Sequence, residues 1–346
     1  MVADVAIVGA GPAGAALAVA LGRRGVRVTL YEKSTAPRLK ACGEGILPHG
    51  VAALAAICRG ALPDAPRVRG LRFVVDGMSA EANFPDGFGV VARRDRLHAW
   101  LLDQVATVPD VDVRTGTLYT PAGERFVVGA DGIRSQFHRR LPAIRPSRRR
   151  VGLSTHIGGI TGVSDQVEVF FHRLGEIYIA PTGGGEALVS ALLDQDGFRR
   201  DGLFHLLRSI PELRDRTTHI EMTSPMLAAA PLGLSVPKVV DDNLLLIGDA
   251  AGAPDPITGD GMSLAFTSVG PAADAIVDGD LMAYQRTRLE MGRTAERLGR
   301  LLLRVAKIQG PAARALLARP SLVPTLLDVA IARRPFNSAT LFRALL

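Results

Sequence analysis

Three side chains with chemical reactivity lie close together in residues 40–50, KACGEGILPHG. Cys42 offers a thiol, Glu44 a carboxylate that can accept or relay a proton, and His49 an imidazole. Three glycines in the same eleven residues allow the backbone to run close to a ligand. The stretch therefore indicates a ligand site in which Cys42 and Glu44 are the catalytic candidates.

Each of these side chains also has a purely structural interpretation. Cys42 can be a small packing residue, because a buried thiol is reactive only where its pKa is lowered. Glu44 can cap a helix or pair with an arginine. His49 follows a proline at a predicted helix start, where it can be exposed. The sequence leaves these alternatives open.

A glycine-rich turn precedes this stretch and predicts a nucleotide site. Residues 5–8 form a short apolar run, GAGPAG follows, and a helix rich in small residues leads to a second apolar run ending at Glu32. This order is typical of a dinucleotide-binding unit, with the pyrophosphate at the helix start and the acid on a ribose. We assign to the nucleotide Gly9, Gly11, Pro12, Ala13, Gly14, Glu32 and Lys33.

Three later segments narrow the nucleotide to FAD. They are RRDRLHAWL, VVGADGIRSQF and NLLLIGDAAGAPDPITGDGM. With the glycine turn, they resemble the FAD-dependent superfamily of para-hydroxybenzoate hydroxylase-like monooxygenases, geranylgeranyl reductases and flavin-dependent halogenases. The resemblance implies an α/β fold: a Rossmann-type (glutathione reductase-like) FAD-binding domain with an inserted sheet-rich substrate domain. It assigns to FAD Cys42, Gly43, Arg94, Asp131, Gly248, Asp249, Pro256, Gly259, Gly261 and Met262.

The resemblance also predicts how the protein acts on the flavin. A helix that begins near Gly261 and Met262 would direct its free N–H groups at the N1–C2=O edge, where reduced flavin carries negative charge. One departure from the family is the short stretch 113–128, where relatives have a longer β-meander. The FAD-binding domain is therefore expected to be trimmed near the adenosine.

The opening stretch resembles elements that lie beside the isoalloxazine ring: the Cys-Gly-Gly of the reductases and the Gly-Glu-Ser-Leu-Leu-Pro of the halogenases. Halogenation is disfavoured, because the strand RVRGLRFVVDG lacks a lysine and EIYIAPTGGG has Glu176 and Tyr178 where halogenases have tryptophans. The same segment resembles the Y-x-W-x-F-P of the reductases, with Tyr178 and Ala180 in place of tryptophan and phenylalanine. Tyr178 is therefore our first candidate for the substrate pocket.

The order of the motifs predicts a discontinuous organisation. Strands are expected in VRGLRFVVDG, MSAEANF, VGLSTHIGG, QVEVFFHR, GEIYIAP and EALVSALL, with a helical stretch near 201–216. The amphipathic segment 295–308 can cap the pocket, pair with another subunit, touch a membrane or pack onto the parent fold, which we favour. The expected parts are an FAD-binding domain at 1–65, 90–145 and 240–280, a substrate domain at 66–89 and 146–239, and C-terminal helices at 281–346.

Composition excludes several classes of protein. The chain is 47% hydrophobic and 22% charged, which is ordinary for a globular protein. Its net charge of +7 comes mostly from arginine, and the dense run Arg145, Arg148, Arg149 and Arg150 indicates a solvated face or attraction for an anionic group rather than nucleic acid. Two cysteines, no signal peptide and no long apolar span predict a cytoplasmic protein, with peripheral membrane contact still open. We expect no metal site.

Three functions remain open. The favoured one is an FAD-dependent monooxygenase that uses NAD(P)H and oxygen to hydroxylate or epoxidise a small hydrophobic aromatic, polyketide or isoprenoid substrate through a flavin C4a-hydroperoxide. The alternative is a geranylgeranyl reductase-like enzyme that saturates isoprenoid double bonds, which Cys42 supports best. The third is a flavin-based redox sensor or partner-binding protein with Cys42 as its reporter.

Overall fold

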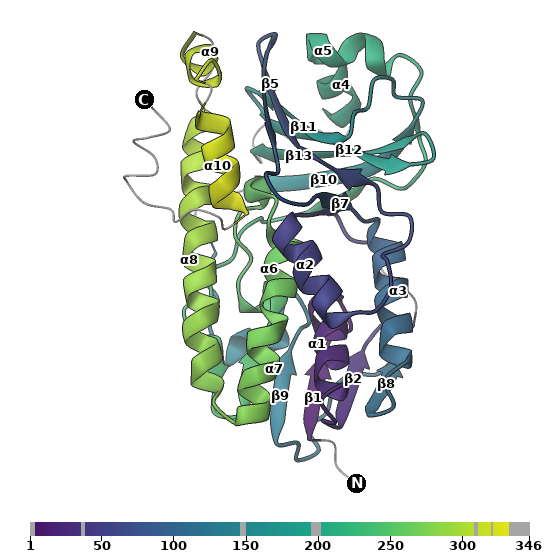
Figure 1. The fold of residues 1–346 in the computed structure, drawn as a ribbon, viewed down its shortest axis with the longest axis vertical. Coiled ribbons are helices and arrows are strands. Elements are labelled where there is room, and N and C mark those ends of the chain that lie inside the picture. Colours follow the sequence, from purple (N-terminus) through teal and green to yellow (C-terminus); the bar gives the residue numbers. More distant parts are fainter. Residues whose placement is uncertain are drawn as a thin grey trace.

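We describe the fold from a computed structural model of the 346-residue chain. The structure describes residues 4–35, 39–145, 150–194, 202–307, 311–319 and 321–331. Two sheets are stacked along the long axis of the molecule, and one long helix runs beside both (Figure 1). No helix among these residues is long and apolar enough to cross a membrane.

The first sheet is the frame of the nucleotide site. Its six strands have the order β16-β17-β9-β1-β2-β8, and every pairing except β16 with β17 is parallel. The inner strands are short apolar runs buried on both faces, as parallel strands between helical layers must be. The strands are β1 (Val5–Val8), β2 (Val28–Glu32), β8 (Val111–Thr115), β9 (Phe126–Gly129), β16 (Val240–Asp241) and β17 (Leu244–Leu246).

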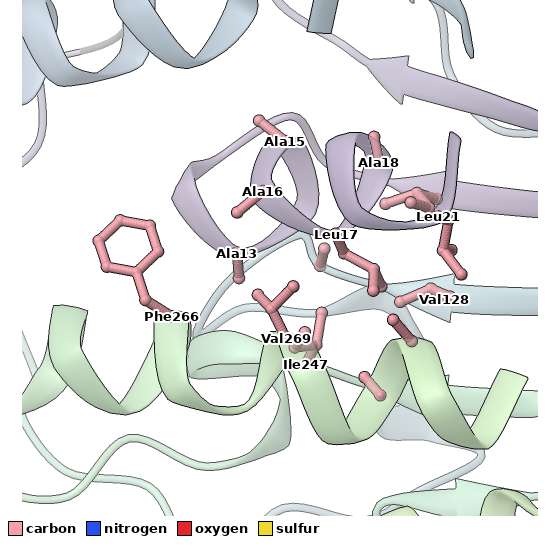
Figure 2. Packing of buried hydrophobic residues seen from close by; sticks show 14 of the residues in the cluster. Ala13, Ala15, Ala16, Leu17, Ala18, Leu21, Val128, Ile247, Phe266 and Val269 are labelled. Carbon is pink, nitrogen blue, oxygen red and sulfur yellow. The ribbon is translucent and has the colours of Figure 1, made fainter. Parts of the chain in front are cut away.

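Small side chains on α1 (Pro12–Gly22) let this helix pack closely against its neighbours. It packs against the helices α6 (Gly261–Thr267) and α7 (Val269–Asp278), and Figure 2 shows Ala13 of α1 facing Val269 of α7, with Val128 of β9 beside them. Two further helices complete this layer, α2 (Pro48–Ile57) against α6 and α3 (Arg94–Ala106) against α1. The alanine-rich sequence of α1 therefore sets how near the chain segments of the nucleotide site can approach one another.

The second sheet forms the other end of the molecule. Its strands follow the order β14-β10-β13-β12-β11-β5-β6, with β15 paired to β10, and only β5 with β11 is parallel. All six strands expected from the sequence are present. The strands are β5 (Gly70–Val75), β6 (Met78–Asn83), β10 (Arg150–Gly158), β11 (Gln166–His172), β12 (Gly175–Gly183), β13 (Glu186–Asp194), β14 (Glu221–Met222) and β15 (Leu227–Ala229).

Helices cover the two faces of this sheet differently. The helices α4 (Gly202–Ser209) and α5 (Pro211–Arg214) pack on the face away from the first sheet (Figure 1). On the other face, Leu302 and Leu303 of α8 (Leu281–Val305) and residues of α10 (Leu322–Ala330) join its apolar side chains. The C-terminal helices thus pack onto the parent fold, as the sequence analysis favoured.

Short elements connect the two sheets. The chain passes between the first and the second sheet through a small three-stranded sheet, formed by β3 (Gly45–Ile46), β7 (Gly89–Val91) and β4 (Arg67–Val68). The remaining elements are α9 (Pro311–Leu317), η1 (Gln136–Arg139), η3 (Asp215–Thr217), η4 (Gly248–Ala251) and η5 (Pro256–Thr258). Residues 116–125 contain no strand, in keeping with the expected trimming. The predicted fold class is confirmed, while the exact domain limits stay a prediction.

Candidate active site

Sterics explain the three glycines of the nucleotide turn. Gly9 has a φ of +108°, and a Cβ there would lie 2.5 Å from the carbonyl oxygen of Ala130. A Cβ on Gly14 would lie 2.0 Å from the carbonyl oxygen of Gly9. Gly11 is different, because a Cβ there would meet nothing within 4 Å. The open space at Gly11 fits the pyrophosphate of a dinucleotide at the start of α1.

Glu32 ends β2 beside this turn, as predicted. One carboxylate oxygen accepts a hydrogen bond from the backbone N–H of Ala10 at 3.0 Å, and the other accepts one from Ser34 at 2.9 Å. The carboxylate therefore shapes the glycine turn as well as standing where a ribose would bind. Lys33 next to it is exposed.

The later flavin motifs meet at the same edge of the first sheet. Arg94 Nη1 lies 3.3 Å from Met262 Sδ, while its buried Nε has no hydrogen-bond partner among the described residues. Asp131 Oδ2 accepts a bond from the backbone amide of Gln136 at 2.9 Å, and its buried Oδ1 has no partner within the same part of the chain. A buried donor and a buried acceptor without partners, close to residues assigned to FAD, fit a polar cofactor.

Asp249, which the resemblance assigns to FAD, forms an ion pair that the sequence did not suggest. Lys40 Nζ donates to Asp249 Oδ2 at 2.8 Å. Burial alone would raise the pKa of the Asp249 carboxyl, but the positive charges of Lys40, Arg94 and Arg288 together outweigh burial, so that the pKa is lowered. Lys40, the first residue of the KACGEGILPHG stretch, thus links this stretch to a residue assigned to FAD.

The remainder of that stretch is held against the start of α6, which begins at Gly261 as expected. The Leu47 amide donates to Ser263 Oγ at 2.9 Å, and His49 Nε2 lies 3.0 Å from Asp260 Oδ1. His49 is therefore half-buried and in contact with Asp260, not exposed. Burial raises the pKa of the Asp260 carboxyl.

Glycines around this contact leave space for a ligand. A Cβ would meet nothing within 4 Å at Gly43, Gly259 or Gly261. Gly248, by contrast, has a φ of +61° and allows η4 to approach Ala13, and Pro256 begins η5. The open space at Gly43, Gly259 and Gly261 thus fits the close approach of a flavin to the backbone at these residues.

Cys42 and Glu44 face the second sheet from within this loop. The Cys42 amide donates to Ser154 Oγ on β10 at 3.3 Å, and burial raises the pKa of the Cys42 thiol. Glu44 is 4% exposed; it accepts a bond from the Arg94 amide at 3.0 Å and lies 2.9 Å from His156 Nε2. The capping interpretation of Glu44 is thus confirmed, with a histidine as its second partner.

Tyr178 lies on the face of the second sheet that turns toward this loop. It is directly opposite Ser190 on β13, which is opposite Ser154 on β10, so that the three side chains share one face. The Tyr178 hydroxyl is buried without a hydrogen-bond partner among the described residues. Burial raises the pKa of this phenol well above 10, so the group stays a hydrogen-bond donor.

Arg150 corrects one sequence interpretation. It is 2% exposed and pairs with Glu176 on β12 and Asp255 before η5, so it is no part of a solvated basic face. The number of arginines in residues 145–150 does not reveal that β10 begins at Arg150 and that the side chain of this residue is buried. Arg145 is exposed, and Arg148 and Arg149 lie outside the described residues.

Comparisons with known proteins agree with this site. A model of the FAD binding domain matches residues 2–48. The menaquinone reductase of Mycobacterium tuberculosis is 30% identical over 86% of this chain and 81% of its own length. The digeranylgeranylglycerophospholipid reductase 2 of Methanopyrus kandleri is 28% identical over 84% and 83%. The chain belongs to this superfamily of FAD-dependent oxidoreductases.

The same fold occurs in relatives named for a different reaction. The crystal structure of PqsL from Pseudomonas aeruginosa, described as a probable FAD-dependent monooxygenase, superimposes with a TM-score of 0.69 at 22% identity, over 88% of this oxidoreductase and 96% of PqsL. The fold therefore does not separate reduction from oxygenation, and the site must be used to choose between them.

Substitution of Gly11 tests the nucleotide turn of this oxidoreductase. Gly11→Val should abolish FAD binding, because its Cβ would fill the open space beside α1. The FAD-free protein should still fold, since the Gly11 backbone (φ −64°, ψ 178°) is accessible to any residue. Flavin absorbance after gel filtration and thermal unfolding measure the two effects.

Gly270→Ala on α7 is the matched control, because a Cβ there also meets nothing within 4 Å. It should keep FAD and raise stability by about 0.5–1 kcal/mol. Full retention of FAD by Gly11→Val would contradict the assignment of this turn.

Proposed function

We propose that this oxidoreductase saturates a carbon–carbon double bond in the isoprenoid chain of a lipid or quinone, with NAD(P)H as the source of electrons. The names of its relatives support this substrate class, since one denotes menaquinone and another a digeranylgeranyl phospholipid. Reduced FAD would supply a hydride, and the protein would supply a proton.

The observation that carries the proposal is the position and state of Cys42. Cys42 lies in residues 40–50, which we assign to the flavin and call the flavin-facing loop; its amide donates to Ser154 Oγ at 3.3 Å, and its Sγ accepts from the Glu44 amide at 3.3 Å. Burial, opposed by the nearby Arg94 guanidinium, raises the pKa of the thiol. A thiol that remains protonated at neutral pH is a proton donor and a poor nucleophile. The state of Cys42 therefore suits the addition of a proton to carbon better than a role as a reactive thiolate.

The surroundings of Tyr178 support an apolar substrate with one polar group. Apolar side chains of three elements pack near it: Leu192 of β13, Ile257 of η5 and Leu302 of α8. A hydrocarbon chain gains free energy when it leaves water for such an apolar surface. The unpartnered Tyr178 hydroxyl would donate to an oxygen of the lipid headgroup or quinone ring.

Tyr178→Phe should separate substrate recognition from stability. Removal of a buried hydroxyl without a partner should stabilise the substrate-free protein by about 1 kcal/mol and raise KM about three- to tenfold. Tyr284→Phe is the control, since the Tyr284 hydroxyl donates to the Leu246 carbonyl at 2.8 Å and its loss should destabilise by about 1 kcal/mol. Equal effects of the two substitutions would contradict the assigned role of Tyr178.

A reaction of the reduced protein tests the function itself. We would reduce the FAD-loaded protein without oxygen and mix it with digeranylgeranylglycerophospholipid in micelles, with menaquinone, or with oxygenated buffer. Flavin reoxidation by a lipid probe, with a product that has gained two hydrogens per double bond, is the expected result. A transient C4a-hydroperoxide with oxygen, and no reaction with either lipid, would favour the monooxygenase instead.

Two further parts of the proposal concern the setting of the reaction. The electron donor is expected to be NAD(P)H, which must reduce the flavin and leave before the lipid reacts. A substrate of this kind resides in membranes, so we expect the protein to contact a membrane surface peripherally from the cytoplasmic side. Cosedimentation of the protein with vesicles of the substrate lipid would test this contact.

A further inference from the structure

A chain of three hydrogen-bonded side chains leads from the flavin-facing loop to the outside of the molecule. Glu44 Oε2 lies 2.9 Å from His156 Nε2, and His156 Nδ1 lies 2.9 Å from Ser224 Oγ. Glu44 and His156 are 4% and 5% exposed, whereas Ser224 is half-buried between two exposed residues, Thr223 and Pro225. The three side chains thus connect a buried loop to the surface.

The backbone holds Glu44 at the inner end of this chain. Its φ of +55° lies in the left-handed region, which is uncommon for a glutamate. Its carbonyl accepts a hydrogen bond from the Ala92 amide at 2.8 Å, and Oε1 accepts one from the Arg94 amide at 3.0 Å. Its own amide donates to Cys42 Sγ at 3.3 Å. One carboxylate oxygen is thus fixed by the main chain, and the other is free to exchange a proton with His156.

Ser224 can serve both protonation states of His156. Its Oγ accepts a hydrogen bond from the His156 amide at 2.9 Å, and its carbonyl accepts one from Thr155 Oγ1 at 2.8 Å, which fixes its position. A hydroxyl has one hydrogen to donate and two lone pairs. Ser224 can therefore donate to Nδ1 of the neutral imidazole or accept from Nδ1 of the charged one, by rotation of its hydrogen alone.

Charged groups flank the three side chains Glu44, His156 and Ser224 on two sides. On the flavin side, Arg94 and Lys40 both interact electrostatically with Cys42. On the sheet side, His156 lies opposite the apolar Leu188 on β13. Glu186, two residues before Leu188 on the same strand, forms an ion pair with Arg93. Among the described residues, the hydrogen-bond partners of the His156 ring are thus Glu44 and Ser224.

We propose that Ser224, His156 and Glu44 form a proton path that resupplies the Cys42 thiol, and this proposal rests on double-bond reduction as the function. A hydride adds to one alkene carbon and the π bond breaks, while the other carbon takes the proton of Cys42. His156 Nε2 then gives its proton to the Glu44 carboxylate as Ser224 passes a proton from water to Nδ1. Glu44 gives this proton on to the Cys42 thiolate, and the ring proton returns from Nδ1 to Nε2 before the next turnover. One solvent proton is consumed per double bond, which balances the hydride.

Chemical rescue tests the path in the FAD-loaded protein. After anaerobic reduction, His156→Ala should be reoxidised by digeranylgeranylglycerophospholipid about 10²-fold more slowly than the unmodified protein, the usual size of an acid–base contribution. Added imidazole should restore most of this rate. Ser224→Ala should slow the reaction less and change its pH profile. Reduction of the flavin itself should stay unchanged in both variants.

Controls make the result decisive. His172→Ala alters a histidine on β11 of the same sheet and should change neither rate nor pH profile. In His156→Gln, the side-chain amide can still donate to Glu44 but cannot pass a proton on. Reoxidation by the lipid should therefore be slow in this variant, and FAD should stay bound. A His156→Ala protein that keeps the full rate, or one that is slow and unaffected by imidazole, overturns the proton path.

A measurement without turnover separates this proposal from the proposed function. In the FAD-loaded protein with ¹⁵N-labelled histidine, we expect His156 to carry its proton on Nε2 at neutral pH, with the Nδ1 resonance shifted by Ser224→Ala. An Nδ1 resonance that ignores Ser224→Ala overturns the path. If no lipid probe reoxidises the flavin, the proposed function fails, and the nitrogen resonances alone decide on the hydrogen-bonded path.

Discussion

Cys42→Ala should slow reoxidation of the reduced flavin by an isoprenoid substrate by roughly 10²- to 10⁴-fold, the range of general acid catalysis. Reduction of the flavin by NAD(P)H should remain within about twofold, because this step needs no proton from the thiol. Stopped-flow absorbance measures both steps in one experiment. The contrast between them would distinguish a proton donor from a residue that only packs beside the flavin.

Cys58→Ala is the matched control. Cys58 is 4% exposed at the end of α2, and burial raises the pKa of its thiol to about 11. Both substitutions remove one thiol, from the half-buried Cys42 or the buried Cys58, but only Cys42 lies in the loop that we assign to the flavin. Cys58→Ala should therefore cost some stability and leave both rates unchanged. Equal rates in Cys42→Ala and the unmodified protein would remove the proton donor from the mechanism.

The pH dependence of the same step follows from the direction of the pKa shift. Burial raises the pKa of Cys42, so the thiol keeps its proton through the neutral range and ionises only at alkaline pH. The rate should be flat near neutral pH and fall as the thiol ionises. A rate that rises toward alkaline pH would instead indicate a thiolate nucleophile.

The glycine turn was predictable because local sterics dictate its residues. Gly9 needs a positive φ, and Gly14 has no room for a Cβ, so the sequence records both requirements directly. The order of strand, turn, helix and acid then identified the nucleotide site. The start of α6 near Gly261 was predicted from the resemblance to the FAD-dependent superfamily, and α6 begins at this residue.

The partners of the reactive side chains could not be predicted, because they are distant in the sequence. Glu44 meets His156 across 112 residues, and His49 meets Asp260 across 211. Which face of β10 His156 occupies depends on the register with β13, and the sequence of β10 alone does not give that register. Lys40 carried no signal apart from the rarity of lysine in this chain.

Arg150→Met should destabilise the protein by about 3–5 kcal/mol, the usual effect of removing one partner from a buried ion pair. Arg150 Nη1 lies 2.5 Å from Asp255 Oδ1, and Nη2 contacts Glu176 and donates to the Leu192 carbonyl at 3.2 Å. Without the guanidinium, two carboxylates would share a site that water hardly reaches. Urea unfolding followed by circular dichroism measures the loss.

The ion cluster also joins the two parts of the active site. Arg150 and Glu176 belong to the second sheet, whereas Asp255 lies in the loop that leads to Gly259 and α6. Asp255 Oδ1 accepts a second bond from the Ile257 amide at 3.1 Å, so that a shift of this carboxylate would also disturb η5. We therefore expect Arg150→Met to weaken FAD retention as well as stability.

A compensated variant distinguishes buried charge from lost packing. In Arg150→Met/Glu176→Leu/Asp255→Asn, both carboxylates are removed and the asparagine oxygen can still accept from Ile257, so most of the stability should return. Arg24→Met breaks an exposed ion pair with Asp274 and should cost at most about 1 kcal/mol. If the triple variant were less stable than Arg150→Met, packing of the arginine side chain, and not the charge it neutralises, would hold the second sheet to the flavin loop.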